Sequence, residues 1–445
     1  MGSVGPDGGV LIYEPRFTDP TQATSMGLWW VERPEDVQRH PINTVCLSAL
    51  HDWTEVANCT EFIQQWPFVF VASPNREFVE LVRRYVRVCV ILSPRAGAFD
   101  GYGSFADFAA EHTSTELDRL LYGAIVEPAY GILEVARIPT VPSLSIPRTL
   151  SGLSKLDKNT RGFRQGELSV WTGKRGEGKS SLLGQILLDA IDQGARVMAY
   201  SGELPARQFR SWALVQAAGP RGVQFVPDPD TGEPVYFATD TVTKLIDAWW
   251  AERFYLSDIN AEFAHNEDRI LDDFAYAHRA LGCDVFLVDN IMTAQLSGDR
   301  DFYRSQSMFA QRLSRFAKAN SVHVHLVAHP RKTQGEKAIV DADDISGSGD
   351  IPNIADNAFS VRRLSDEDAE KMGFSSVVNI LKCRETGAKG IKVALGFDPT
   401  VKRFWCPGDG GPDRAYGWER AEQMDLTELG SDEPVPFETE REGEK

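Results

Sequence analysis

The stretch that decides the fold is WTGKRGEGKSSLL, residues 171–183. It contains Gly173, four intervening residues, and then Gly178, Lys179 and Ser180, which is the P-loop spacing G-x-x-x-x-G-K-[ST]. A strand-like apolar run precedes the loop and a run with helical spacing follows it. In that setting the backbone N–H groups of the loop cradle the phosphates of a nucleoside triphosphate. The loop predicts a nucleotide-binding site, but it does not say what the nucleotide drives.

The metal and phosphate ligands can be assigned from the same motif and one later strand. Lys179 is expected to reach the β- and γ-phosphates, and the Ser180 hydroxyl is expected to bind Mg²⁺. Asp289 directly follows the apolar run 285–288, and a strand-end acid of this kind completes the metal site. The expected cofactors are therefore ATP, or another NTP or dNTP, and Mg²⁺. The expected cofactor-binding residues are Gly173, Gly176, Gly178, Lys179, Ser180, Ser181 and Asp289.

Two glutamates compete for the role of orienting or activating the water that attacks the γ-phosphate. Glu203, in AYSGEL, stands at the end of the strand after the P-loop helix, whereas Glu177 lies inside the loop. Glu203 is preferred because loop positions such as 177 usually point to solvent. The sequence therefore predicts Glu203 as the catalytic glutamate.

Histidines mark the strand HVHLVAH, which ends at His329. One interpretation of His329 is a plain strand-end histidine bonded to backbone. The other, which we favour, is a contact to the γ-phosphate, because this strand should lie beside the strand that carries Asp289. His323 and His325 alternate on the strand and are expected to pack within the sheet. Together with the P-loop, these residues describe an ATPase core of the RecA type.

The composition is that of an ordinary globular protein. The chain has 445 residues, 42% of them hydrophobic, and a formal net charge of −17. This charge argues against a surface coated with nucleic-acid-binding groups, although it permits a local basic channel. No apolar stretch approaches the ~20 residues of a membrane span, and no signal or transit peptide is seen. The six cysteines are scattered without a C-x-x-C pair, which favours a reduced, cytoplasmic compartment and argues against a zinc site.

Four parts follow one another along the chain. Residues 1–135 have an α/β rhythm, and residues 136–152, with their prolines and serines, form an expected linker. In residues 153–410 near-continuous apolar strands alternate with helices, which predicts a mostly parallel sheet covered on both faces. Residues 425–445 form an acidic tail that is expected to be disordered. The fold class is therefore α/β, with a RecA-like P-loop NTPase domain behind a smaller α/β domain.

A long polar segment after His329 is the candidate for the part that the nucleotide moves. Structureless loops of this length in compact domains are usually functional or disordered. Basic side chains and exposed backbone N–H groups there could hold a phosphodiester chain without reading bases, and a solvated loop is the alternative. The expected DNA-binding residues are Arg331, Lys332, Lys337, Gly347, Ser348 and Gly349.

Lys382 and Arg384, in ILKCRETG, lie two apart and so on one face of a strand. Arg384 could pair with Glu385 or another neighbouring acid, which is the default for a surface arginine. It could instead act in trans as an arginine finger on the γ-phosphate of a neighbouring subunit. That second role requires an oligomeric ring.

These motifs, in this order, resemble the hexameric replicative helicases of the DnaB type, and most closely the phage primase–helicase and Twinkle branch. The resembling stretches are GKRGEGKSS, AYSGEL, FLVDN, HLVAHPRK, DISGSGDIPNIADNAF and ILKCRETGAKG, and they span about residues 151–405. The resemblance implies that Glu203 is the catalytic glutamate, Asp289 the Walker B acid and His329 the sensor. It also implies that Arg384 acts in trans with Lys382 as its companion, and that the loop 331–349 lines a pore.

The N-terminal region resembles, more weakly, the TOPRIM fold found ahead of the helicase in this branch. WPFVFVASPNREF is similar to the strand that normally ends in D-x-D, but Ser73 and Asn75 stand where the metal-binding aspartates would be. NTVCLSALHDW lacks the glutamate expected after the first strand. Because primer synthesis needs carboxylates to hold Mg²⁺, we expect residues 1–135 to be primase-inactive. The alternative is an unrelated α/β domain.

The resemblance implies a ring-forming helicase, a homohexamer or heptamer, that couples NTP hydrolysis to 5′-to-3′ translocation on single-stranded DNA and to unwinding. The linker would pack on a neighbouring subunit. The acidic tail would dock a replicative polymerase, or else only keep the chain soluble. The setting would be the cytoplasm of a bacterial or phage-infected cell. The alternative function is a RecA-like DNA-dependent ATPase without unwinding, either a recombination mediator or an inactive replisome scaffold.

Overall fold

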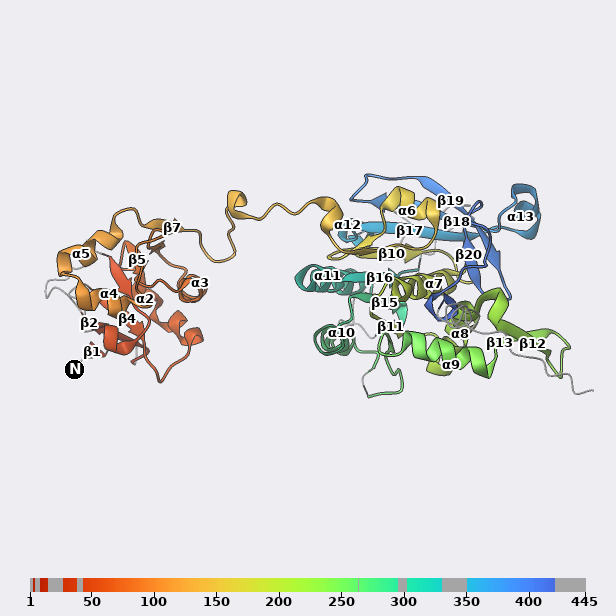
Figure 1. Cartoon of the computed structure of the whole chain (residues 1–445), viewed down its shortest axis with the longest axis horizontal. Helices are drawn as coiled ribbons and strands as arrows, with labels where there is room; N and C mark the ends of the chain where they lie inside the picture. The colour runs from red at the N-terminus through yellow and green to blue at the C-terminus, as the bar shows by residue number, and fades with distance from the viewer. Residues whose placement is uncertain are drawn as a thin grey trace, which may run out of the picture. The chain divides into compact units, whose positions relative to one another are not determined.

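The computed structural model describes residues 3–4, 9–14, 27–37, 43–262, 264–294, 302–329 and 350–420. The chain forms two compact units, Met1–Thr140 and Val141–Lys445 (Figure 1). In the described parts of the chain, no helix is both long enough and apolar enough to cross a membrane.

The first unit is built on a mixed sheet with the strand order β1-β2-β4-β3-β5-β6-β7. Its centre, β4-β3-β5-β6, is parallel, and the outer strands are antiparallel. Successive residues of β3 point to opposite faces, so Trp29 and Trp30 are buried in two different clusters and both faces are covered. The strands are β1 Ser3–Val4, β2 Leu11–Glu14, β3 Leu28–Trp30, β4 Thr44–Leu47, β5 Phe68–Val71, β6 Val90–Ser93 and β7 Ile125–Glu127. The α-helices are α2 Thr60–Ile63, α3 Arg76–Tyr85, α4 Phe105–Glu111 and α5 Ser114–Asp118.

In the first unit, the expectation that no glutamate follows the first strand is wrong. The first parallel strand is β3, not the strand in NTVCLSALHDW, and Glu32 stands two residues after it. The Glu32 carboxylate accepts a hydrogen bond from the Ser73 hydroxyl at the end of the adjacent β5. A glutamate is therefore present after the first strand, facing Ser73. The Asn75 side chain is used differently, because it caps α3 by accepting from the Glu77 N–H at 3.0 Å.

The second unit is built on a nine-stranded sheet with the order β14-β11-β15-β16-β10-β17-β18-β19-β20. The strands from β14 to β17 are parallel, as predicted, and β18 to β20 extend the sheet in antiparallel fashion. The strands are β10 Leu168–Thr172, β11 Val197–Ser201, β14 Phe254–Leu256, β15 Val285–Asp289, β16 His323–Val327, β17 Asn357–Arg363, β18 Ser376–Cys383, β19 Ile391–Asp398 and β20 Arg403–Trp405.

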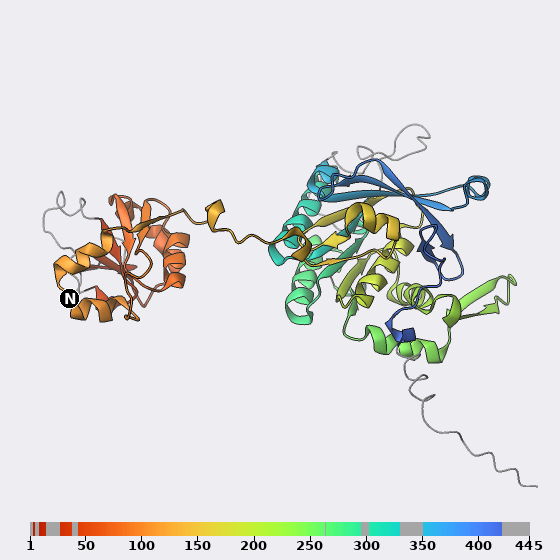
Figure 2. The same ribbon diagram turned by 45° about the horizontal axis from the view of Figure 1, so that its top comes forward.

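Helices cover both faces of this sheet (Figures 1 and 2). One face packs on α7 and α8 through a core that includes Leu183, Ile186 and Ala217, and the other packs on α10 and α11 through Phe274 and Phe309. The helices are α6 Ser154–Thr160, α7 Lys179–Asp192, α8 Ala206–Gly222, α9 Asp240–Trp250, α10 Glu267–Leu281, α11 Phe302–Asn320, α12 Asp350–Ile354 and α13 Asp366–Met372. Smaller elements are the two-stranded ribbons β8 Arg148–Thr149 with β9 Phe163–Arg164 and β12 Val223–Pro227 with β13 Pro234–Ala238. The 3₁₀ helices are η2 Pro34–Asp36, η3 Trp53–Cys59, η4 Arg119–Leu121, η5 Val135–Arg137, η6 Ser143–Ser145 and η7 Ile291–Thr293.

The boundaries of the second unit lie outside the predicted range 153–410. At its start, β8 pairs with β9, and the Leu150 N–H donates to Gln193 Oε1 at 2.8 Å. At its end, Tyr416 and Trp418 are buried in the same core as α7. Residues 148–152 therefore pack on their own unit, and packing of the linker on a neighbouring subunit stays a prediction.

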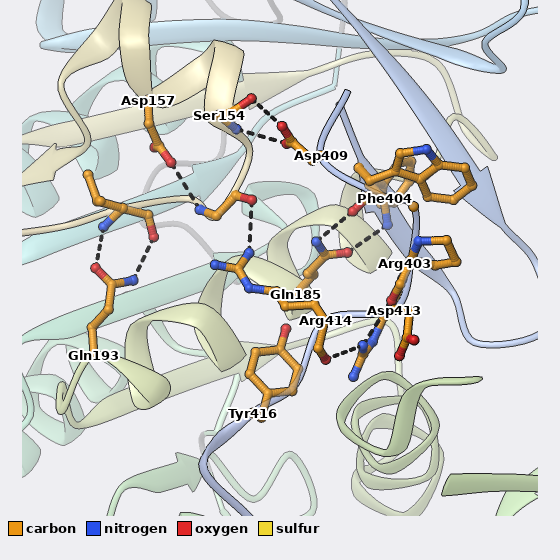
Figure 3. Close-up of a pocket in the computed structure, with 15 residues that line it drawn as sticks. Ser154, Asp157, Gln185, Gln193, Arg403, Phe404, Asp409, Asp413, Arg414 and Tyr416 are labelled. Atoms are coloured by element: carbon orange, nitrogen blue, oxygen red, sulfur yellow. Dashed lines mark hydrogen bonds between the residues drawn. The ribbon is translucent and has the colours of Figure 1, made fainter. Parts of the chain in front are cut away.

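A cavity of about 470 Å³ lies where the start and the end of this unit meet (Figure 3). Its polar walls bond to one another: Arg414 Nη1 donates to the Gly152 carbonyl at 2.8 Å, and Asp157 accepts from the Gly152 N–H at 3.1 Å. Gln185 exchanges two hydrogen bonds with the Phe404 backbone, at 2.9 and 2.7 Å. The Gln185 bonds thus fasten β20 to α7, the helix that follows the P-loop, and the Arg414 bond joins the C-terminal segment to the start of the unit.

Candidate active site

The P-loop connects β10 to α7, and two of its glycines are required by the geometry. Gly173 has φ of +145°, and a Cβ there would collide with the Val361 carbonyl oxygen on β17. Gly178 has φ of +89° and immediately precedes the first residue of α7. Left-handed backbone is costly for residues with a Cβ, so the motif's glycines allow the chain to turn tightly into the helix. The N–H groups at the start of α7 are thereby presented at the loop.

Lys179 is buried at the start of α7, and its ammonium group closes the loop from inside. Its Nζ donates to the carbonyl oxygens of Gly173 at 2.8 Å and of Lys174 at 2.7 Å. Burial lowers the pKa of Lys179, while the carboxylates of Asp289, Glu177 and Glu203 oppose that shift. A buried ammonium surrounded by carbonyl dipoles is suited to receive phosphate oxygens.

Asp289 ends β15, which is separated from β10 by one strand, and its carboxyl group is almost fully buried. Burial raises the pKa of Asp289 to about 6, and a hydrogen bond with the Ser180 side chain opposes that rise. The hydroxyl of Ser180 and the buried carboxylate thus lie side by side. Oxygen ligands of this kind fit Mg²⁺, and a cation would relieve the cost of the buried charge.

Glu203 and His329 are brought together by a residue that the sequence reasoning missed. The Asn290 amide Nδ2 donates to Glu203 Oε1 at 2.5 Å and to His329 Nε2 at 3.0 Å. Glu203 Oε1 and His329 Nε2 are themselves 3.7 Å apart. Asn290 follows Asp289 directly, and this position after the predicted metal ligand was the available signal. The ends of β11, β15 and β16 therefore meet in one polar cluster beside the P-loop.

The alternative glutamate is occupied elsewhere. Glu177 accepts a hydrogen bond from the Arg363 backbone N–H at the end of β17. It therefore fixes the P-loop to the neighbouring strand, whereas Glu203 lies in the cluster with His329. The contacts favour Glu203 as the group that faces the water.

The other two histidines of the strand are internal, as predicted. His323 is buried, with Nδ1 2.6 Å from the Arg164 carbonyl oxygen and Nε2 3.0 Å from Ser169 Oγ. His325 is also buried, and its Nδ1 accepts from Trp171 Nε1 at 3.2 Å. Burial lowers the pKa of His323 to about 4, and it also lowers the pKa of His325 well below that of a free histidine.

Lys382 and Arg384 lie at the opposite end of the sheet from the P-loop. Lys382 Nζ donates to the carbonyls that end α12, among them Ala355 at 2.6 Å. Arg384 Nη1 donates to Asp356 Oδ1 at 2.7 Å, and its side chain is still 55% exposed. The sequence left the acid partner of Arg384 open, and here it is Asp356. Glu385 pairs instead with two other arginines, Arg161 and Arg164.

Several predicted residues lie outside the described part of the chain. They are the DNA-binding candidates Arg331, Lys332, Lys337, Gly347, Ser348 and Gly349, and the acidic tail 425–445. His329 is the last described residue before that segment.

A parallel sheet with the P-loop at the end of one strand and a buried acid two strands along is the arrangement of RecA-like nucleotide-binding domains, and the second unit is of that class. Comparison with known families is more specific. The family described as "DnaB-like helicase C terminal domain" matches residues 149–405, more than half of the chain, and the chain belongs to this family.

Individual relatives share only low sequence identity with the chain. The chain is 27% identical over 257 residues to a DNA helicase/primase of Enterobacteria phage T3, a match that covers 54% of this chain and 42% of the phage protein. The chain thus spans less than half the length of that relative. Among solved structures, a DnaB-like replicative helicase studied with primase has 18% identity and a TM-score of 0.49, covering 58% of this chain and 62% of that one. A KaiC-like protein from the archaeon Pyrococcus horikoshii has 16% identity and a TM-score of 0.41, covering 59% and 99%.

Proposed function

We propose that this protein is the motor of a replicative DNA helicase, which hydrolyses ATP to move along single-stranded DNA and separate a duplex. Membership of the DnaB-like family supports the class of motor. The observation that carries the proposal is that the two ends of the central sheet carry different groups. Its P-loop end holds the groups for hydrolysis, and its other end presents an exposed arginine that cannot reach its own P-loop.

Each group at the P-loop end has a role that its surroundings support. The Lys179 ammonium binds the β- and γ-phosphates, and Ser181 follows in the first turn of α7 with its N–H toward the phosphates. Ser180 and Asp289 hold Mg²⁺, which when bound neutralises charge on the phosphoryl oxygens. Glu203 accepts a proton from, or orients, the attacking water. His329 contacts the γ-phosphate and passes its presence or loss to the segment that follows.

The other end of the sheet supplies the neighbouring subunit. Arg384 stabilises the γ-phosphoryl group bound by the next subunit, and Lys382 holds the strand end in place by capping α12. Reaching between subunits requires a ring, a hexamer or a heptamer. Single-stranded DNA passes through its pore, held by Arg331, Lys332 and Lys337 and by the backbone of 347–349, and moves 5′ to 3′ by resemblance to the family.

The first unit and the tail complete the proposal. With Ser73 and Asn75 in place of aspartates, Glu32 is left without the partners that a two-ion primase site needs, so this TOPRIM-like unit makes no primers. The acidic tail 425–445 docks a replicative polymerase.

The test is strand displacement on a forked DNA duplex with ATP and Mg²⁺. Wild-type protein should unwind the fork, Arg384→Ala should not, and Arg161→Ala should resemble wild type. Arg161 is the matched control, because it is an equally exposed arginine near the same end of the sheet but pairs with Glu385. DNA-stimulated hydrolysis without any unwinding by the wild type would instead favour a RecA-like ATPase that does not translocate.

A further inference from the structure

Asn290 stands between the catalytic glutamate and the histidine that leads into the segment 330–349. We propose that Asn290 is a positioning residue which couples the orientation of Glu203 to the position of His329, and so to DNA. This inference rests on the proposed function, because it assigns Glu203 to the water and the segment after His329 to DNA.

The orientation of the Asn290 amide is fixed by its own backbone surroundings. Its Oδ1 accepts from the Met292 N–H at 2.8 Å, so the Nδ2 end must face the cluster. Nδ2 carries two hydrogens, and the structure provides two acceptors, Glu203 Oε1 and His329 Nε2. His329 Nε2 accepts in the tautomer that carries its proton on Nδ1. Both donors of the amide are therefore used, one on each side.

Asn290 is also held more firmly than Glu203, one of the two groups that it joins. It is 1% exposed, and Thr293 returns to its carbonyl oxygen through both Oγ1, at 2.7 Å, and N–H, at 3.2 Å. The Tyr200 hydroxyl on β11 donates in turn to the Thr293 carbonyl at 3.3 Å. The Glu203 side chain, by contrast, is 46% exposed. A fixed amide between a half-exposed carboxylate and a loop-leading histidine can orient both.

The coupling follows from how the two hydrogen bonds share one planar group. When His329 turns toward a γ-phosphate, or is drawn by the segment after it, the Asn290 donor on that side is released. The amide can then realign about its Oδ1 anchor, and the carboxylate that it holds realigns with it. DNA bound after His329 thereby changes how well Glu203 faces the water, without touching Glu203. Coupling between two sites in a protein is typically worth about 5- to 150-fold.

Two substitutions separate the coupling from the local turn. Asn290→Ser keeps a short oxygen acceptor for the Met292 N–H but has no amide to reach Glu203 and His329, whereas Asn290→Ala removes both functions. Hydrolysis is measured with and without single-stranded DNA. Both variants should lower the stimulation by DNA by about tenfold, within the usual range of such coupling, and leave the KM for ATP near the wild-type value. Asn379→Ser, at a buried asparagine in the middle of β18, is the matched control and should leave the stimulation unchanged.

A double-mutant cycle with His329→Ala tests the coupling between Asn290 and His329 in the rate of ATP hydrolysis without DNA. If the two residues act through one another, the double variant Asn290→Ser/His329→Ala should hydrolyse ATP no more slowly than the worse single variant. Additive losses, unchanged DNA stimulation in Asn290→Ser, or an effect of Asn290→Ala alone would each overturn the inference. Failure of the proposed function looks different, because the wild type would then hydrolyse ATP without unwinding the fork while the cycle could still be non-additive.

Discussion

Arg384 and Lys179 lie at opposite ends of the central sheet. Arg384 follows β18, whose last residue, Cys383, pairs with Asn357 at the start of β17, and Asn357 in turn pairs with Ser169 near the start of β10. Lys179 lies beyond the other end of β10. The five residues of β10 alone span roughly 16 Å at about 3.3 Å per residue. One chain therefore cannot bring this arginine to its own P-loop.

Mixing two inactive variants should restore activity if Arg384 acts in trans. Arg384→Ala subunits keep an intact P-loop, and Lys179→Ala subunits keep the arginine, so mixed interfaces contain one complete site. We expect each variant alone to be nearly inactive and mixtures to recover part of the wild-type hydrolysis, measured as phosphate release across mixing ratios. No recovery at any ratio would contradict action in trans.

The two glutamates near the nucleotide should differ sharply when each is changed to glutamine. Glu203→Gln should reduce kcat at least about a hundredfold, the usual contribution of a general base, with ATP binding retained. Glu177→Gln keeps an oxygen that can accept from the Arg363 N–H, so its rate should stay near wild type. Single-turnover hydrolysis and nucleotide binding measured separately would decide, and equal losses would reject the assignment.

Buried His323 should make the second unit sensitive to acid. Its pKa is lowered to about 4 in the folded protein from 6.5. The unfolded chain therefore takes up a proton first, so stability is complete above pH 6.5 and falls as the pH drops toward 4. The loss reaches about 3 kcal/mol. His323→Gln should lower stability at pH 7.5 but show a shallower decline between pH 6.5 and 4 in denaturant unfolding. Parallel curves for the two proteins would contradict this.

Binding of single-stranded DNA should depend on the basic residues after His329. Each lysine or arginine that neutralises a phosphate contributes a slope of about −0.7 in the logarithmic dependence of affinity on salt. Arg331→Ala/Lys332→Ala should weaken binding for all sequences alike and make the slope shallower by about 1.4. Fluorescence anisotropy across salt concentrations measures both. Lys371→Ala, an exposed lysine in α13, is the control and should change neither.

The first unit should gain a metal site when aspartates are placed at positions 73 and 75. Ser73→Asp/Asn75→Asp places one carboxylate against Glu32 and a second one two residues further along the chain, where the new aspartate can still cap α3. Carboxylate oxygens gathered in this way bind Mg²⁺ or Mn²⁺. We expect isothermal titration to detect Mn²⁺ binding by residues of this unit that a further Glu32→Gln substitution removes. Equal binding with and without Glu32 would show that the site is not formed.

The grouping of the candidate residues at the P-loop end could be predicted from the sequence because strand ends of a parallel sheet meet at one edge. Lys179, Asp289, Glu203 and His329 each follow an apolar run, so order along the chain was enough to bring them together. Asn290 was not found, because a polar residue after a strand is also typical of a turn. Its function depends on partners 87 and 39 residues away along the chain.

Two further predictions were wrong because the local sequence signal is weak: the first strand of the first unit and the end of the second unit. The strand Leu28–Trp30 is only three residues long, so the sequence pattern indicates the longer run around Thr44–Leu47 as the first strand and does not single out Glu32. The end of the second unit was misplaced because Tyr416 and Trp418 follow a glycine-rich stretch that resembles a domain end. Burial of those rings against α7 depends on tertiary packing, which has no local signature.

The strands β15, β16, β10, β17 and β18 are hydrogen-bonded side by side in one sheet. Asp289, the proposed metal ligand, ends one of these strands, and Arg384, proposed to act on the neighbouring subunit, directly follows another. We expect a continuous hydrogen-bonded sheet of this kind to move as one unit. In the proposed ring, opening the cleft around one nucleotide would therefore also move the arginine that serves the next site. Neighbouring sites would then be in different states, so the proposed ring would hydrolyse nucleotide in a fixed order.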